Sequence, residues 1–195
     1  EQGLSESVVY DIVQDNDGYI WMATGYRLNK FDGVRFENFF EQQGLNSART
    51  RTLFIDEEGK IWVGSESGVN YIDQDSIYNE PVYQLMRNST VISIYQDGNG
   101  DMWFGTDGDG LWHFSQDELV AQYTTSNGLA DNRIRAIEEG KSDELWFATR
   151  NGLSRLSNGS FRNFRVEDGL PANRIRDLKV DDSGSLWIGS RNGLV

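Results

Sequence analysis

Residues 128–153 read GLADNRIRAIEEGKSDELWFATRNGL, and residues 169–194 read GLPANRIRDLKVDDSGSLWIGSRNGL. The two stretches align without a gap, and each places its tryptophan at the same position. Such self-similarity at a fixed period is the signature of a repeat architecture, in which each repeat is one structural unit. The same tryptophan recurs along the chain at gaps of 41, 41, 43 and 41 residues, as Trp21, Trp62, Trp103, Trp146 and Trp187.

The residues around each tryptophan recur as well, and they predict hairpins. Four repeats have an aspartate six residues before the tryptophan and a glycine three residues before it. In such a D-x-x-G turn the aspartate can bond the backbone two residues on, while glycine adopts a positive φ without steric cost. The fourth repeat inverts this order, with Gly140 and Asp143. The four aspartates are Asp15, Asp56, Asp97 and Asp181.

Each repeat therefore reads as strand, D-x-x-G turn, strand, glycine turn, strand, short loop and strand. The fourth strands are expected at residues 36–40, 82–86, 119–124 and 161–165, and the fifth repeat ends after two strands. In the first repeat Arg27 replaces the glycine of the second turn, so that turn is expected to differ. Four short strands in about 41 residues fit one antiparallel blade of an all-β propeller. The repeats span approximately residues 3–43, 44–87, 88–127, 128–168 and 169–195 of a single propeller segment.

The first strand of each blade should pack on both faces, since a blade lies between two neighbours. Apolar pairs three residues apart, such as Val9 with Ile12 and Ile134 with Ile137, are expected to point to opposite faces because strand side chains alternate. The five periodic tryptophans are interpreted as blade-to-blade packing, and an aromatic ligand platform is the alternative. Trp112 lies outside the period and is expected to matter less.

The composition of the 195 residues excludes several classes of protein. The chain is 37% hydrophobic and 25% charged, and its 21 glycines and 12% aromatics favour many short strands and tight turns. A net charge of −13 disfavours nucleic-acid binding and anionic membranes. The absence of cysteine excludes a disulfide scaffold and a thiolate site. The sequence shows no apolar run long enough to span a membrane and no signal peptide.

Few residues could perform chemistry, so no catalytic residue, metal ligand or cofactor is predicted. The single histidine, His113, cannot form a triad or a histidine-rich metal site alone, and it is interpreted as a surface or blade-edge residue. The acidic loops at residues 97–101 and 106–110 superficially suggest calcium, yet both coincide with blade turns. A propeller lyase or glycosidase is the enzymatic alternative, for which Asp11 and Asp177 are scattered candidates.

Arginines are the candidate ligand-binding residues. Pairs of arginines stand 13 and 11 residues before the tryptophan in three repeats, and two more occupy the turns TRNG and SRNG, which should open on the same face. Guanidinium groups could hold a carboxylate or a sugar through forked hydrogen bonds. The alternative is that they pair with Glu66, Asp107, Asp109 or Asp131 and clamp adjacent blades. The eight candidates are Arg49, Arg51, Arg133, Arg135, Arg150, Arg174, Arg176 and Arg191.

Residues 3–24, 128–156 and 169–194 resemble two-component regulator propeller repeats, and the resemblance extends over essentially the whole chain. It implies the periplasmic, extracytoplasmic sensor region of an inner-membrane signalling protein, such as a hybrid histidine kinase or a diguanylate cyclase. Long arrays that form seven-bladed propellers are typical of the family, and some members bind oligosaccharide breakdown products. Departures are Arg27, the inverted turn of the fourth repeat, and the loss of the leading Gly-Leu in the third.

The expected function is therefore ligand sensing, without catalysis in this segment. The expected partners are a small molecule or an oligosaccharide, further blades and signalling domains of the parent chain, and a second copy in a homodimer, but no nucleic acid. The array is expected to continue toward seven blades, because the fifth repeat ends after two strands. A purely structural dimerisation module remains a further alternative.

Overall fold

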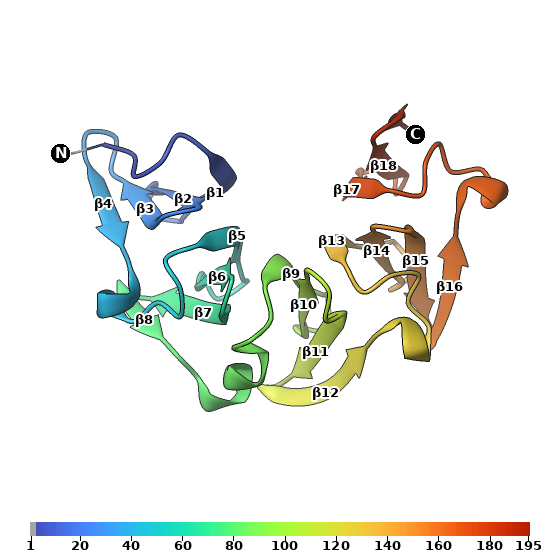
Figure 1. The fold of residues 1–195 in the computed structure, drawn as a ribbon, viewed down its shortest axis with the longest axis horizontal. Coiled ribbons are helices and arrows are strands. Elements are labelled where there is room, and N and C mark those ends of the chain that lie inside the picture. The colour runs from blue at the N-terminus through green and yellow to red at the C-terminus, as the bar shows by residue number, and fades with distance from the viewer. Residues whose placement is uncertain (1–2) are drawn as a thin grey trace. The chain divides into compact units, whose positions relative to one another are not determined.

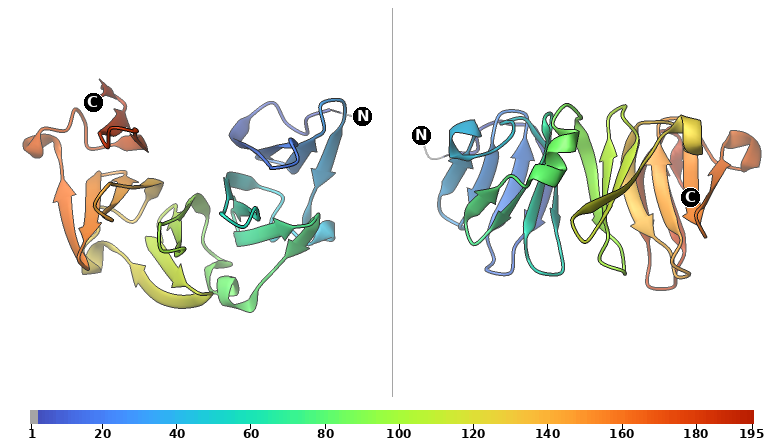
Figure 2. Two further views of the ribbon diagram at one scale, coloured as in Figure 1. Left: turned by 180° about the vertical axis from the view of Figure 1, so that it is seen from behind. Right: turned by 90° about the horizontal axis from the view of Figure 1, so that it is seen from below.

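A computed structural model describes residues 3–195, which form five antiparallel sheets of consecutive strands, here called blades 1 to 5 (Figure 1). Within each sheet the strands lie side by side in chain order (Figure 2). The strands are β1 (Val9–Gln14), β2 (Ile20–Thr24), β3 (Leu28–Phe31) and β4 (Phe36–Phe39) in blade 1; β5 (Thr50–Ile55), β6 (Ile61–Ser65), β7 (Gly68–Asp73) and β8 (Ser76–Tyr78) in blade 2; β9 (Val91–Gln96), β10 (Met102–Thr106), β11 (Leu111–Ser115) and β12 (Glu118–Tyr123) in blade 3; β13 (Ile134–Glu139), β14 (Leu145–Thr149), β15 (Gly152–Ser157) and β16 (Ser160–Phe164) in blade 4; and β17 (Ile175–Val180), β18 (Leu186–Ser190) and β19 (Gly193–Leu194) in blade 5.

The prediction of an all-β propeller of antiparallel blades is confirmed. Blade 5 has a short third strand, β19, where the sequence predicted only two strands. The chain forms two compact units, a first that ends at Ile94 and a second that spans Tyr95–Val195.

Four short 3-10 helices connect the blades: η1 (Glu41–Gln43), η2 (Pro81–Met86), η3 (Thr125–Asn127) and η4 (Val166–Asp168). The strand predicted at residues 82–86 is wrong, since this segment is η2 and the fourth strand of blade 2 is β8. Pro81 begins η2, where its missing N–H and fixed φ suit the first helical position. Gln74 and Asp75, at φ of 47° and 62°, form the tight turn that starts β8 earlier.

The D-x-x-G turns hold a hydrogen bond that ties each turn to its tryptophan. In blade 2, Asp56 Oδ1 accepts the backbone N–H groups of Glu58 and Lys60 at 3.0 and 2.8 Å. Its Oδ2 accepts Trp62 Nε1–H at 2.8 Å. The spacing of six is what antiparallel pairing requires, because Ile55 pairs with Ile61 and places the tryptophan beside the turn. The same three bonds are made by Asp15, Asp97 and Asp181.

A β-bulge interrupts the first strand of blades 1, 2, 4 and 5 near its start. In blade 4, Ile134 pairs with Thr149 and Ala136 pairs with Ala148, so one residue between them is left out of the ladder. Because of this bulge, the prediction that the two residues of each apolar pair point to opposite faces is wrong. Ile134 and Ile137 oppose residues two apart on β14, and therefore lie on the same face, in one core cluster. The alternation rule failed because an extra residue shifts its phase.

Apolar clusters between neighbouring blades form the core. In the first unit Trp21 of blade 1 packs with Leu53, Ile61 and Val63 of blade 2. In the second unit Trp103 of blade 3 packs with Phe147 and other residues of blade 4. Burying such large aromatic side chains contributes strongly to stability.

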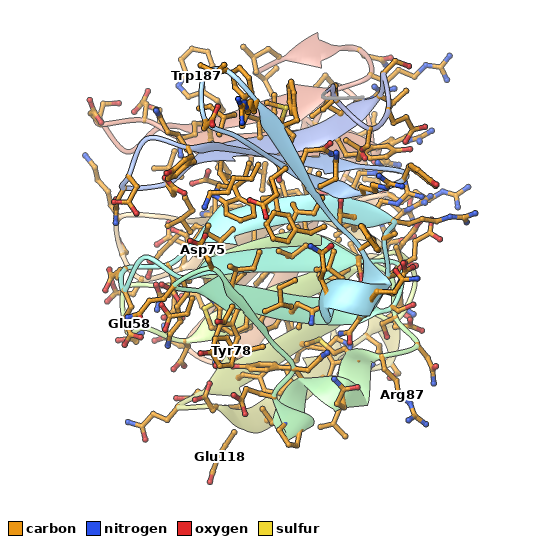
Figure 3. All side chains as sticks on the ribbon, turned by 90° about the vertical axis from the view of Figure 1, so that its left-hand side faces the viewer. Glu58, Asp75, Tyr78, Arg87, Glu118 and Trp187 are labelled. Carbon is orange, nitrogen blue, oxygen red and sulfur yellow. The ribbon has the colours of Figure 1, made fainter. Side chains whose placement is uncertain are left out.

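The tryptophan of blade 5 has a different environment. Trp187 is 45% exposed and lies at the surface in Figure 3, whereas Trp21, Trp62 and Trp103 are at most 4% exposed. Trp146 is partly buried against the cluster that contains Ile175. Among residues 3–195, no sheet follows β19 to cover the face that carries Trp187.

The second turn of a blade is anchored to the loop that enters the next blade. Gly110 has a φ of 83°, and its N–H donates to the carbonyl oxygen of Asn132 at 2.9 Å. Gly152, at a φ of 129°, donates in the same way to Asn173 at 2.7 Å. Arg27, which replaces this glycine in blade 1, is not among the residues with positive φ, as expected for a turn of another type.

Candidate functional site

The arginine pairs lie at the start of the first strand in blades 2, 4 and 5. The first member of each pair directly precedes the strand, and the second member is the residue left out of the ladder at the bulge. Bulges redirect a side chain without breaking the sheet, which is why they are frequent beside binding sites. The bulge residues are Arg51, Arg135 and Arg176, with Tyr10 in the same place in blade 1.

The second turn of each blade lies at the same end of the sheet as the arginine pair. Ile134 pairs with Thr149, so the turn that begins at Arg150 follows directly across the ladder from the start of β13. The hydrogen bond from Gly152 N–H to the Asn173 carbonyl then holds this turn against the loop that carries Arg174. The fold thus gathers arginines of blades 4 and 5 at one edge of the second unit.

The residue that follows the last Ser or Thr of the second strand decides the charge of this edge. It is an acid in blades 2 and 3, and an arginine in blades 4 and 5. These residues are Glu66, Asp107, Arg150 and Arg191.

In blade 2 the acid neutralises its own arginine pair. Glu66 accepts a hydrogen bond from Arg49 Nη1 at 3.2 Å and forms a close ion pair with Arg51. The hydrogen bond from Arg51, and then that from Arg49, hold the pKa of the Glu66 carboxyl below its usual value. The Arg51 guanidinium also lies over the Tyr10 ring, 4.4 Å from its centroid. In this blade the arginines pair with an acid, as the alternative interpretation expected, but the pairing lies within blade 2 and does not clamp adjacent blades.

Arg133 of blade 4 is neutralised by the acid of the preceding blade. It forms a close ion pair with Asp107, and an isolated β-bridge joins the two residues. Of the other acids proposed as partners, Asp131 accepts the backbone N–H of Arg133 at 2.9 Å instead of its guanidinium. Asp109 forms no ion pair within residues 3–195.

Arg135 has no such partner. Its Nε is buried and has no hydrogen-bond acceptor, and no described residue forms an ion pair with its guanidinium. Burial lowers the pKa of Arg135 below its usual value, and the positive charges of Arg133, Arg174 and Arg176 lower it further, against the opposing effect of Asp107. Arg135 is therefore a half-buried cation among other cations.

The four remaining candidates are exposed on the second unit. None of them forms an ion pair within the part of the chain that the structure describes. The eight predicted arginines thus divide into three that are paired with acids and five that are not. The four exposed residues are Arg150, Arg174, Arg176 and Arg191.

The remaining polar candidates have structural environments. His113 is not a surface residue, because its side chain is only 12% exposed; it stacks on Trp103 at 3.8 Å and its Nε2 lies 2.8 Å from Asp101 Oδ2. Asp97 is occupied by its turn and by the Trp103 indole. No group of three His, Cys, Asp or Glu residues within residues 3–195 could hold a metal ion. None of the described helices is long and apolar enough to span a bilayer.

A cavity in the first unit was not predicted from the sequence. A cavity of about 570 Å³ is lined by turn and strand residues of blades 1 and 2, among them Glu58 and Asp75, which Figure 3 labels. Lys30 lies within it, 4.1 Å from the centroid of the Tyr19 ring and bonded to Asp75. Its lining combines turn residues with Trp21, Lys30, Ile61 and Ile72 of the strands, and the sequence analysis assigned Trp21 to blade packing.

Solved structures with the same fold include bacterial extracellular domains. The extracellular domain of the hybrid two-component system BT3049 from B. thetaiotaomicron is 23% identical with a TM-score of 0.87, and the match covers 98% of this chain and 27% of that one. The corresponding domain of BT4673 from the same organism is 18% identical with a TM-score of 0.80, at 95% and 29% coverage. This chain therefore spans less than a third of the length of either domain.

An enzyme also shares the fold. Virginiamycin B lyase from Staphylococcus aureus is 17% identical with a TM-score of 0.73, and the match covers 98% of this chain and 67% of the lyase. No curated protein sequence matches the chain significantly. At these identities the solved structures establish the fold alone.

The repeat family itself is identified from the sequence. The family described as two component regulator propeller matches the chain four times, at residues 3–26, 85–108, 128–151 and 169–192. Each match ends at the second turn of a blade, and together the matches fall in blades 1, 3, 4 and 5. The chain belongs to the two-component regulator propeller family.

Proposed function

We propose that this chain is an extracytoplasmic ligand-sensing segment of a bacterial transmembrane signalling protein, of the two-component sensor kinase or diguanylate cyclase type. The segment recognises a small molecule or an oligosaccharide, and signalling domains elsewhere in the parent chain respond to it. A periplasmic location, further blades in the parent chain and association of two copies belong to the same proposal. The family match and the likeness to extracellular domains of two-component systems support it.

The observation that carries the proposal is the group of unpaired arginines on blades 4 and 5. In a chain with a net charge of −13, acids are abundant, and blade 2 shows that this same edge can neutralise its arginines. Blades 4 and 5 instead place arginines where the neutralising acid would stand. Cations gathered without a structural partner are available to a ligand.

Binding without catalysis is favoured over the lyase alternative. The only histidine, His113, is held between Trp103 and Asp101. Asp11, a carboxylate considered for the lyase alternative, accepts hydrogen bonds from Thr52 Oγ1 at 3.0 Å and Leu53 N–H at 2.8 Å, which clamp blade 1 to blade 2. General acid–base catalysis needs a group free to exchange a proton with a substrate.

The test is a binding screen by isothermal titration calorimetry with neutral and charged mono- and oligosaccharides and small organic acids. We expect saturable binding of at least one compound, and recovery of that compound chemically unchanged by mass spectrometry. The double variant Arg174→Gln/Arg176→Gln should lose this binding. Arg162→Gln, an exposed arginine on the outer strand β16, is the matched control and should retain it.

Three outcomes would contradict the proposal. Conversion of the ligand to a product would favour the lyase alternative. Absence of binding across the screen, together with a stable dimer in light scattering, would favour a structural dimerisation module. Equal binding by the double variant and the Arg162→Gln control would show that the ligand is recognised elsewhere.

A further inference from the structure

Blade 2 provides an internal reference for the unpaired arginines. Its pair and the acid at its second turn form a closed set, in which Glu66 contacts both Arg49 and Arg51. Blade 4 has the same geometry, with a bulge at the second arginine and a turn at the same end of the sheet. The difference is one of charge, because Arg150 stands where blade 2 has its acid.

The excess of positive charge extends from blade 4 to blade 5. Strands β13 and β17 are neighbours, and each carries an arginine pair at its start. Arg135 of β13 is affected by the charges of both Arg174 and Arg176 of blade 5. Its buried Nε has a hydrogen to donate and no acceptor in residues 3–195. A buried donor without an acceptor is costly, and like charges at short range add to that cost.

An oxyanion between the two blades would remove both costs at once. Its oxygens would accept hydrogen bonds from Arg135 and its charge would offset those of Arg174 and Arg176. Guanidinium groups match carboxylate and phosphate oxygens in forked geometry. A single negative charge neutralises only one of the three arginines, so an anion with two or more charges fits the site better.

We propose that Arg135, Arg174 and Arg176 bind a multiply charged oxyanion that bridges blades 4 and 5, and that its binding strengthens the contact between these blades. The inference rests on the proposed function and names the ligand class of that site. Binding is coupled to stability, because a ligand of the folded state shifts unfolding to higher temperature. The junction of β13 and β17 is then the element that responds to the ligand.

The experiment measures the thermal midpoint against the concentration of citrate, inorganic phosphate or potassium chloride at matched ionic strength. Citrate and phosphate carry several charges and distinguish a carboxylate source from a phosphate source, while chloride controls for screening. We expect a saturable rise with citrate or phosphate and none with chloride. Calorimetry of the same titration should give a Kd at least tenfold weaker for Arg135→Gln and for Arg176→Gln.

Arg49→Gln is the matched control, since Arg49 is an exposed arginine already paired with Glu66. It should leave the anion titration unchanged. A rise in midpoint that grows linearly without saturation, or that is the same in Arg135→Gln as in the native chain, would overturn the inference, since excluded salts stabilise proteins in general. If Arg135→Gln does not fold, Arg176→Gln, at an exposed position, decides the question alone.

The outcome separates this inference from the proposed function. A neutral ligand found in the calorimetric screen, together with no saturable effect of citrate or phosphate on the thermal midpoint, would leave the sensing function standing and overturn the oxyanion site. A saturable anion effect that both Arg135→Gln and Arg176→Gln abolish would support the inference even if no neutral compound binds.

Discussion

Asp56→Ala tests the hydrogen bond that joins each D-x-x-G turn to its tryptophan. The substitution removes an acceptor of three hydrogen bonds, two from turn N–H groups and one from Trp62 Nε1. Water can replace the carboxylate at the turn N–H groups, since Glu58 is exposed and Lys60 is half-buried. The indole belongs to a side chain that is only 4% exposed, and it loses this carboxylate inside the protein.

The expected loss follows from these environments. Hydrogen bonds to charged groups contribute about 1.5–3 kcal/mol each, and a buried donor left without its acceptor costs about 1–3 kcal/mol. We therefore expect Asp56→Ala to lower the free energy of unfolding by about 3–5 kcal/mol. Asp56→Asn keeps an oxygen for the turn but turns its NH₂ group toward the indole, and about 2–3 kcal/mol is expected.

Urea unfolding followed by far-ultraviolet circular dichroism measures these values, with comparison of m-values to confirm that the unfolded surface is unchanged. Asp143→Asn is the matched control, because blade 4 lacks the aspartate six residues before its tryptophan. Asn tolerates the φ of 57° at this position, so a change within about 0.5 kcal/mol is expected. If Asp56→Ala and Asp143→Asn cost the same small amount, the hydrogen bond to the indole contributes nothing and the reasoning is refuted.

Three further tests, which use five substitutions, address other parts of the structure. Trp62→Ala should cost about 3–5 kcal/mol as a core truncation, and Trp187→Ala clearly less because its side chain is 45% exposed; equal losses in urea unfolding would contradict the burial difference. Glu66→Gln should reduce the loss of stability in acid. Because the pKa of Glu66 is lowered in the folded state, its ionised carboxylate stabilises the fold above the unfolded pKa of about 4.3, and this contribution is lost as the pH falls. The thermal midpoint of the variant should therefore fall less steeply from pH 7 to pH 2 than that of the native chain. Gly110→Ala should lower the free energy of unfolding by at least about 3 kcal/mol, because its φ is positive and the new Cβ would overlap the backbone carbonyl oxygen of Tyr123. Gly33→Ala, with no atom within 4 Å, should cost about 1 kcal/mol, and a similar loss at both glycines would rule out the steric explanation.

The sequence predicted the blade because the period of the tryptophan and the turn signals agree with each other. It also showed Asp56 six residues before Trp62, but it did not predict the hydrogen bond between their side chains. Pairing of β5 with β6 brings the two together in space, and chain spacing alone does not show this. A signal was present nonetheless, since a spacing kept in four repeats and lost at Gly140 indicates a contact between the two residues.

The faces to which the side chains of each blade's first strand point could not be predicted in the same way. A period of two assumes an unbroken ladder, and the bulge at Arg135 depends on how β13 meets β14. The positions of the arginines were predictable, but their partners depend on one residue of the second turn. Glu66 in blade 2 and Arg150 in blade 4 stand at the same place in the repeat, and comparison of the repeats at that place would have separated the paired Arg51 of blade 2 from the unpaired Arg135 of blade 4.

The bulge at the start of the first strand has a consequence for how such a protein can change. The bulge residue makes no ladder pair, so the same backbone ladder accepts side chains of different size and charge at this place. The chain itself contains the demonstration, since the same place holds Tyr10 in blade 1 and Arg51 in blade 2 on similar ladders. Substitution at this one site per blade is therefore a route to new recognition properties that keeps the strand pairing of the blade.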